Sequence, residues 1–258
     1  MTDTTGKVAV VTGGGRGIGW GIATRLQREG WQVVAADVEP GETAAARDGV
    51  VYRAMDVRDR DQVASTMAGV VGDFGRIDLL VNNAGIQRHR ALTELTWEEW
   101  SAVVDVNLHG VFNCLQAAGR IMVAAGGGIV VNITSVSAER GAPGRAPYNT
   151  TKAAIIALTK CAAVEWAAAG IRVNAVGPGY VNTGVFRAAV AGGTLDPEVV
   201  LSRIPARRLA EVDEVAGMVS FLASPDAAYM TGQTLFVDGG FLADFGVDLT
   251  KPGGTEAR

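Results

Sequence analysis

The stretch TGGGRGIG, at residues 12–19, directly follows the run KVAVVT that begins at Lys7. An apolar, β-branched run followed by glycines predicts a strand that turns sharply into a helix. Such glycines let the backbone approach a pyrophosphate, and the helix N-terminus offers free N–H donors. Gly13, Gly17 and Gly19 have the spacing G-x-x-x-G-x-G, which differs from the G-x-G-x-x-G fingerprint. The stretch therefore favours a dinucleotide-phosphate loop, with a tight turn and close helix packing as the alternative explanation.

The same strand and helix alternation continues along the chain. Apolar, largely β-branched runs begin at residues 7, 31, 50, 77, 128, 171 and 234, and helical stretches lie between most of them. Nearly continuous apolar strands are typical of a parallel sheet covered on both faces. We therefore predict an α/β fold, a doubly wound, mostly parallel seven-stranded sheet with helices on both faces, of the Rossmann type. One domain is expected over residues 1–258, with a variable substrate loop at about 183–208 and a C-terminal tail from about 242.

The composition excludes several classes of protein. Apolar residues make up 48% of the 258 residues and charged residues 19%, which suits a buried core. The net charge of −4 gives no electrostatic reason to expect nucleic acid or an anionic membrane as a partner. Cys114 and Cys161 lie in apolar helical stretches, so we expect two buried free thiols in a reducing compartment and no metal site. No stretch resembles a signal peptide or a membrane span, and the expected location is cytoplasmic.

Acidic residues follow the second predicted strand, where the adenosine half of a dinucleotide would bind. Asp37 lies about 20 residues beyond the glycine loop, where a carboxylate accepts hydrogen bonds from ribose hydroxyls and repels a 2′-phosphate. Glu39 adds a second negative charge, whereas Arg16 offers a guanidinium to a phosphate. The balance favours NAD over NADP. Asp56, at the end of the third predicted strand, is placed to accept from the adenine amino group, with a helix N-cap as the alternative.

Tyr148 and Lys152 form the candidate catalytic pair. They lie four residues apart on a predicted helix and therefore share one face. A phenol titrates near pH 10, and a neighbouring ammonium together with a positive nicotinamide ring would lower its pKa enough for proton exchange. Ser135 follows the fifth predicted strand, at the carboxyl edge of the sheet, where its hydroxyl would hold a substrate oxygen or cap a turn. The NNAG turn at residues 82–85 ends the fourth strand, where its amides are expected to tie adjacent strands and approach a ribose, with an Asx-type turn as the alternative.

Together these motifs resemble the short-chain dehydrogenase/reductase family in its compact single-domain form. The resemblance covers residues 6–240 and rests on TGGGRGIG, Asp56-Val57, NNAG, VNLHGVF, TSVS, YNTTK, GPGYVNT and VDGG, in this order. It implies a hydride transfer between a nicotinamide cofactor and an alcohol or ketone. The cofactor contacts that it implies, with those argued above, are Gly13, Arg16, Gly17, Ile18, Gly19, Asp37, Asp56, Val57, Asn83, Gly85, Tyr148, Lys152, Pro178, Gly179, Val181 and Thr183.

The resemblance also assigns roles to individual residues. It implies that Tyr148 exchanges the proton, that Lys152 binds the nicotinamide ribose and lowers the tyrosine pKa, and that Ser135 orients the carbonyl. Asn107 would anchor a water in a proton relay, although on bare sequence it is an ordinary polar helix residue. Helices that hold Asn107 and Tyr148 usually pack against a second subunit in this family, so a homo-oligomer is implied, with a tetramer favoured.

The substrate is the part of the function that the sequence determines least. Candidate substrate contacts are Ser135, Tyr148, Gln87 and Arg145, with Arg88, His89 and Arg90 as further candidates and residues 183–208 as a lid. The string NNAGIQRHR resembles gluconate 5-dehydrogenases, and arginines suit a polyol-derived sugar acid, although solvated loop charges explain them as well. Two alternatives remain open. One is an NADP-dependent 3-oxoacyl carrier-protein reductase, and the other is a non-catalytic nucleotide-sensing protein on the same sheet.

Overall fold

The computed structural model describes residues 6–42 and 49–244, and these contain one seven-stranded parallel sheet. Its strands are β1 (Val8–Thr12), β2 (Gln32–Asp37), β3 (Val50–Ala54), β4 (Leu79–Asn82), β5 (Gly128–Ile133), β6 (Ile171–Pro178) and β7 (Thr234–Val237). Their spatial order is β3-β2-β1-β4-β5-β6-β7, and every neighbouring pair is parallel. The predicted α/β class and the seven strands are confirmed, and the sheet is parallel throughout. Most of the predicted C-terminal tail lies outside the described residues.

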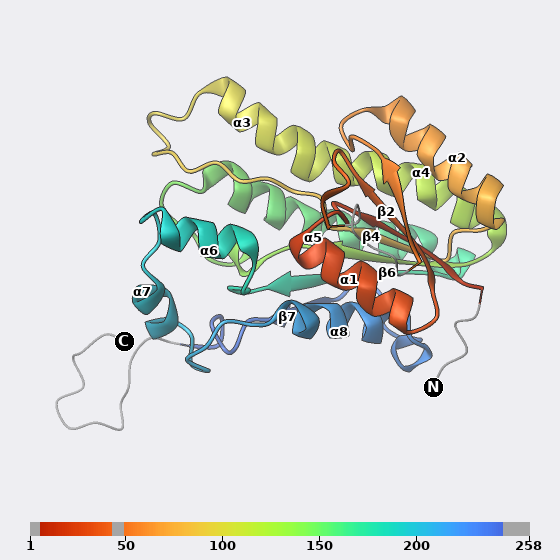
Figure 1. Cartoon of the computed structure of the whole chain (residues 1–258). Helices are drawn as coiled ribbons and strands as arrows, with labels where there is room; N and C mark the ends of the chain where they lie inside the picture. Colours follow the sequence, from red (N-terminus) through yellow and green to blue (C-terminus); the bar gives the residue numbers. More distant parts are fainter. Residues whose placement is uncertain (1–5, 43–48, 245–258) are drawn as a thin grey trace.

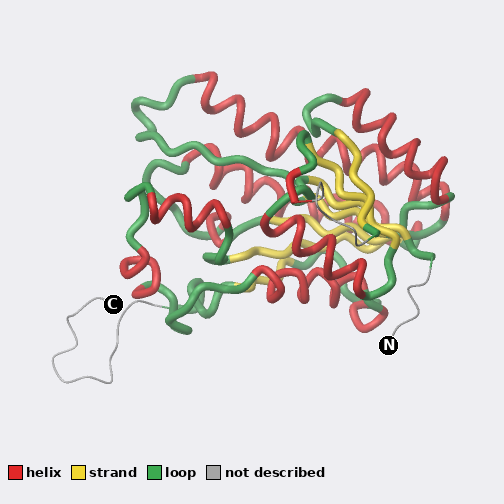
Figure 2. Tube along the Cα trace, viewed as in Figure 1, coloured by secondary structure: helices red, strands yellow, loops and turns green. Residues whose placement is uncertain are grey.

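Helices cover both faces of the sheet (Figures 1 and 2). They are α1 (Gly17–Arg28), α2 (Arg60–Phe74), α3 (Trp97–Val104), α4 (Gly110–Ala125), α5 (Ala146–Trp166), α6 (Gly184–Ala191), α7 (Pro197–Ser202) and α8 (Val212–Ala223). A π-helical turn (Asp105–His109) joins α3 to α4, and short 3-10 turns lie at Val136–Ala138, Ala167–Ala169 and Pro225–Ala227. None of the helices in the described part has both the length and the hydropathy that a membrane span requires.

Alternate residues of each strand pack into two separate hydrophobic cores, one on each face of the sheet. Val8 and Val10 pack with α2, α4 and α5 on one face, whereas Ala9 and Val11 pack with α1 and α8 on the other. All four side chains are at most 1% exposed, because successive side chains of a strand point to opposite faces. This two-sided burial explains why the strands are almost continuously apolar in the sequence.

The strand order places the functional region. The chain runs from β1 outward to β2 and β3, and then returns to β4 on the opposite side of β1. Ligands of open α/β sheets bind at such a reversal, in the crevice beyond the carboxyl ends of the strands. The glycine loop after β1 and the NNAG turn after β4 meet at this point.

The two cysteines differ from expectation in one respect. Both are free, and Cys114 is buried in α4 as expected, but Cys161 is exposed on α5. The apolar composition around Cys161 was not sufficient to place it, because α5 has one face on the sheet and another on the surface. In the described part of the chain, no cluster of three or more His, Cys, Asp or Glu side chains has the arrangement of a metal site.

Candidate active site

The glycine loop has the geometry that a phosphate requires. Gly13 and Gly17 have φ of +61° and +56°, in the region that favours glycine. A Cβ on Gly19 would lie 2.1 Å from the carbonyl oxygen of Gly13, so no larger residue fits there without a shift of backbone. The α1 N-terminus already attracts an anion, since the Gly17 N–H donates to the Glu42 carboxylate at 3.3 Å. These features fit the pyrophosphate of a dinucleotide.

Asp37 is held at the end of β2 against this loop. Its two carboxylate oxygens accept from the backbone N–H of Gly15 at 3.0 Å and of Val38 at 2.8 Å. The charge is therefore fixed in position where the ribose of the adenosine half would bind. Arg16, the residue that precedes α1, is exposed.

Asp56 has a partner that the sequence analysis did not identify. The Arg58 Nε donates to both of its carboxylate oxygens at 3.0 Å, and Nη2 adds a further contact. This hydrogen bond is the main reason why the pKa of the Asp56 carboxyl is lowered. The alternative assignment of Asp56 as a helix N-cap was wrong, because Asp59 caps α2 by accepting from Asp61 and Gln62.

The NNAG turn fastens β4 to the glycine loop. The Asn83 side-chain amide donates to the carbonyl oxygens of Thr12 and Gly13, both at 3.0 Å. The Thr12 hydroxyl in turn accepts from the backbone N–H groups of Asn83 and Ala84 at 3.1 Å. The Asn83 amide therefore ties β4 to the end of β1, as predicted, whereas its approach to a ribose stays a prediction.

Tyr148, Lys152 and Ser135 converge at the carboxyl end of β5. Both α5 residues face the same side, with the Lys152 Nζ 5.6 Å from the centre of the Tyr148 ring. The Lys152 ammonium is buried and donates to the carbonyl oxygen of Ile133 at 2.8 Å. Ser135 caps the 3-10 turn that follows β5 by accepting from Ser137 N–H at 3.1 Å. Ser135 can therefore cap this turn and still lie beside Tyr148.

Burial dominates the ionisation of both α5 groups. It raises the pKa of the Tyr148 phenol, while a hydrogen bond with Ser135 and the charge of Arg145 act in the opposite direction. It also lowers the pKa of Lys152 from 10.5 to about 8. Without a cofactor, burial therefore outweighs the influences that lower the pKa of Tyr148. The expected lowering includes the charge of the nicotinamide ring and concerns the cofactor-bound protein.

Asn107 lies in the π-helical turn between α3 and α4 and is completely buried. Its Oδ1 accepts from Ile86 N–H at 2.8 Å, and its Nδ2 donates to the Ile86 carbonyl at 2.9 Å and to the Thr151 hydroxyl at 3.3 Å. Asn107 thus connects the NNAG loop to α5. Such single π-turns occur often at functional sites.

Two cavities meet at these residues. The larger, of about 670 Å³, is lined by every predicted cofactor residue except Val181. The smaller, of about 220 Å³, is lined by all four predicted substrate residues, by Val181 and by His89. Arg88 lines the larger cavity, and Ser135 and Tyr148 line both. Arg90 lines neither, because its guanidinium pairs with Glu99 at the start of α3 at 2.9 Å.

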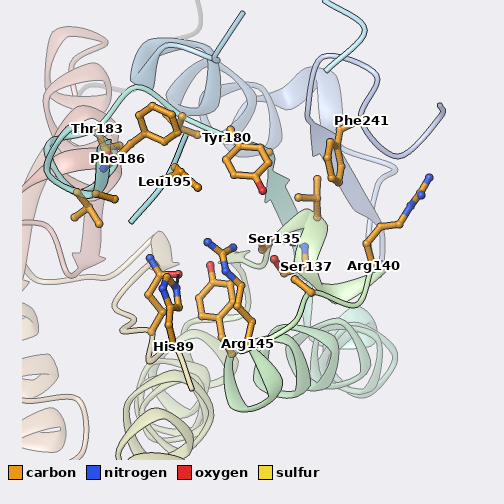
Figure 3. Close-up of a pocket in the computed structure, with 18 of the residues that line it drawn as sticks. His89, Ser135, Ser137, Arg140, Arg145, Tyr180, Thr183, Phe186, Leu195 and Phe241 are labelled. Carbon is orange, nitrogen blue, oxygen red and sulfur yellow. Dashed lines mark hydrogen bonds between the residues drawn. The ribbon is translucent and has the colours of Figure 1, made fainter. Parts of the chain in front are cut away.

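The sequence analysis missed the aromatic wall of the smaller cavity. Tyr180 makes edge contacts with Phe186 and Phe241, with ring centres 6.5 Å and 5.8 Å apart. Figure 3 shows these rings on one side of the cavity and Arg145 and His89 on the other. The rings come from the end of β6, from α6 and from the segment after β7, so no local pattern in the sequence joins them. Most of the lid predicted at 183–208 is helical, and α6 contributes Val185 and Ala189 to the lining.

Comparison with known proteins identifies the family. A family model described as Enoyl-(Acyl carrier protein) reductase matches residues 13–242, which is most of the chain. The chain belongs to the short-chain dehydrogenase/reductase family. A 3-oxoacyl-[acyl-carrier-protein] reductase of Synechocystis sp. is 41% identical over 251 residues, which cover 94% of this chain and 99% of the relative. The reductase FabG of Staphylococcus aureus is 42% identical over 243 residues, covering 91% and 97% of the two chains.

A solved structure of the same family gives a direct structural comparison. The gluconate 5-dehydrogenase of Burkholderia cenocepacia, in complex with NADP and tartrate, superimposes with a TM-score of 0.88 at 40% identity. The match covers 93% of this chain and 96% of that one. As a short-chain dehydrogenase/reductase, this protein is an oxidoreductase that uses a nicotinamide cofactor and acts on CH–OH or keto groups.

Proposed function

We propose that this short-chain dehydrogenase/reductase is an NAD-dependent enzyme in which Tyr148 exchanges a proton with the substrate oxygen. The observation that carries this proposal is the junction of the two cavities. The larger cavity matches a dinucleotide in its lining and the smaller one matches a small substrate, and Ser135 and Tyr148 line both. A group that must touch both substrate and cofactor has to lie at such a junction.

Each residue at the junction has a chemical task. The nicotinamide, when bound, accepts or supplies the hydride. The Ser135 hydroxyl hydrogen-bonds the substrate oxygen, and the Tyr148 hydroxyl gives that oxygen a proton or removes one. Lys152 is held by Ile133 at the floor of the larger cavity, where it binds the nicotinamide ribose. Asn107 fixes the Ile86 backbone and is proposed to anchor a relay water.

The preference for NAD rests on Asp37. Its carboxylate is fixed by two backbone N–H donors, so it cannot turn away from a 2′-phosphate without losing both hydrogen bonds. The Burkholderia relative was solved with NADP, and Arg16 of this chain lines the cavity, which are arguments for the other cofactor. Paired fluorescence titrations with NADH and NADPH decide the point, and we expect NADH to bind more tightly.

Two substrate classes compete for the smaller cavity. We favour a polyol or sugar acid, because Gln87 and Arg145 line a cavity of only 220 Å³ and because the Burkholderia relative is a gluconate 5-dehydrogenase. The second candidate is a 3-oxoacyl carrier-protein reductase with NADP. It is supported by the two reductases that are 41% and 42% identical over almost the whole chain.

The broader proposals concern assembly and location. A homotetramer is proposed because exposed apolar side chains lie on α4 and α5, among them Phe112 at 42% and Val164 at 81% exposure. We also propose a single domain with a lid at 183–208, and a cytoplasmic location in keeping with two free thiols. Light scattering of the purified protein measures the oligomer directly.

The test of the catalytic proposal is Tyr148→Phe. Removal of the hydroxyl should abolish turnover of every alcohol and ketone that the wild type accepts, and NADH affinity should stay within about twofold. Equal turnover by the variant would contradict the proposal. A wild type that turns over nothing with either cofactor would support the nucleotide-sensing alternative.

A further inference from the structure

The smaller cavity contains an arginine that has no anionic partner. Arg145 precedes α5 by one residue and lines the cavity together with Ser135 and Tyr148. Neither a hydrogen bond nor an ion pair of its guanidinium is present among the described residues, although it acts electrostatically on His89 and Tyr148. No Asp or Glu lines the described cavity. Burying part of a guanidinium removes water from it and costs free energy, and no negative charge in the described cavity offsets that cost.

The other arginine of the cavity already has partners. Arg140 donates through Nη2 to the carbonyl oxygens of Leu242 at 3.2 Å and Asp244 at 3.0 Å, and so fixes the segment that carries Phe241. Arg140 therefore stabilises the segment that supplies Phe241 to the aromatic wall, whereas Arg145 faces this wall across the cavity (Figure 3). Arg145 is thus the arginine whose guanidinium is available to a ligand.

Neutral hydrogen-bonding groups surround the Arg145 side of the cavity. The Gln87 side-chain amide lies 3.3 Å from the His89 Nε2, and both residues line the cavity. Burial and the Arg145 charge lower the pKa of His89, so its ring is neutral at pH 7. A ligand on this side of the cavity meets the positive charge of Arg145, two neutral polar groups and, opposite, three aromatic rings.

From this arrangement we propose that the substrate is a small hydroxy acid or oxo acid whose carboxylate binds Arg145, with its C–H face against Tyr180, Phe186 and Phe241. The planar guanidinium offers two parallel N–H donors that match a carboxylate. The volume of 220 Å³ lies below the roughly 300–1,000 Å³ of sites for drug-sized ligands, so the acid is short. This inference rests on the proposed function, because the reacting carbon must lie beside Ser135 and Tyr148.

The test compares an acid with its neutral counterpart. Tartrate and tartramide have the same skeleton and differ in charge, so their affinities for the NAD-saturated protein, measured by calorimetry, isolate the carboxylate. We expect tartrate to bind at least tenfold more tightly. In Arg145→Met, tartrate affinity should fall by about 10- to 100-fold, the value of a charge-assisted pair, while tartramide affinity stays unchanged. Arg145→Lys keeps the positive charge but loses the two parallel N–H donors, so its affinity for tartrate should lie between those of the wild type and Arg145→Met.

Arg187→Met is the matched control. Arg187 lies on α6, bonds the Asn182 side chain at 2.8 Å and does not line the cavity, so tartrate affinity should not change. NADH affinity, measured in parallel, should be the same in all variants if the fold is intact. Failure of tartrate to bind better than tartramide, or a preference for tartrate that survives in Arg145→Met, overturns the inference.

The proposed function is checked separately with a neutral alcohol. If the wild type oxidises sorbitol and Tyr148→Phe does not, but tartrate binds no more tightly than tartramide, the proposed function is supported and this inference is overturned. A KM for gluconate that is lower than the KM for sorbitol in the wild type, with this difference lost in Arg145→Met, supports both.

Discussion

Replacing Lys152 by methionine should stabilise the cofactor-free protein at pH 7 and at the same time abolish turnover. The Lys152 side chain is 4% exposed, and its ammonium donates one hydrogen bond, to Ile133. Burial lowers its pKa from 10.5 to about 8. At roughly 1.4 kcal/mol per pKa unit, keeping this group charged at neutral pH costs about 3 kcal/mol. Methionine fills a similar volume without the charge.

The opposing term is the loss of the hydrogen bond to Ile133. An unpaired buried carbonyl costs about 1–2 kcal/mol, so the net gain for Lys152→Met is about 1–2 kcal/mol at pH 7. The folded pKa of Lys152 lies below its unfolded value, so the unfolded chain binds more protons between pH 8 and pH 10.5. The contribution of Lys152 to the stability of the wild type therefore rises with pH across this window, and the advantage of the variant shrinks. Burial raises the folded pKa of the Tyr148 phenol and of the Cys114 thiol, so both groups lower stability as pH rises through their unfolded values, but they do so equally in the two proteins and cancel in the difference between variant and wild type.

Urea unfolding at pH 7 and pH 9.5, at one protein concentration and without cofactor, measures both quantities. Lys160→Met, on the exposed face of the same helix, is the control and should change the free energy of unfolding by less than about 0.5 kcal/mol. A Lys152→Met protein that is less stable than the wild type by the same amount at both pH values would refute the reasoning. The buried charge would then not be the dominant cost.

Three further outcomes follow from the site. Asp37→Ser should narrow the preference for NADH over NADPH by about 100- to 200-fold, since two charges about 5 Å apart interact by roughly 3 kcal/mol at an effective dielectric constant near 20; fluorescence titration of both cofactors measures this preference. Gly19→Ala should abolish NADH binding because its Cβ would lie 2.1 Å from a backbone oxygen, whereas Gly69→Ala, whose Cβ meets nothing within 4 Å, should not. Asn107→Ala should lower kcat and the free energy of unfolding, the latter by about 2 kcal/mol in a melt, because both polar groups of the Ile86 backbone lose their side-chain partner.

Strands and the main motifs could be predicted from local patterns. Burial on both faces gives continuous apolar runs, and a phosphate loop needs glycines at fixed positions, so both leave a signal within a few residues. Tyr148 and Lys152 lie four apart on one helix, and the helix itself brings them together. Local geometry is enough in each of these cases.

Features that depend on tertiary contacts left no comparable signal. The aromatic wall joins Tyr180, Phe186 and Phe241 across about 60 residues of chain, and only the folded β6–β7 region brings them together. The sequence offers Arg145 as a substrate ligand and Arg90 as a further candidate, but Glu99 neutralises Arg90 and no acidic side chain of the described part pairs with Arg145. The effect of burial on the Tyr148 pKa left no signal either, because helical spacing indicates neighbouring charges and says nothing of burial.

Burial disfavours the charged form of both residues in the proposed catalytic pair. It raises the pKa of the Tyr148 phenol and lowers that of the Lys152 ammonium, so each group is more easily neutral than in water. Within the described protein, the influences that favour phenolate are the Ser135 hydrogen bond and the Arg145 charge. A carboxylate bound to Arg145 would neutralise the second of these. If the proposed function holds, oxidation of a hydroxy acid would therefore require positive charge from the bound cofactor, whereas reduction of an oxo acid would use a phenol that is already protonated. The free-energy cost of burying the Lys152 ammonium would then be offset only when the dinucleotide binds it.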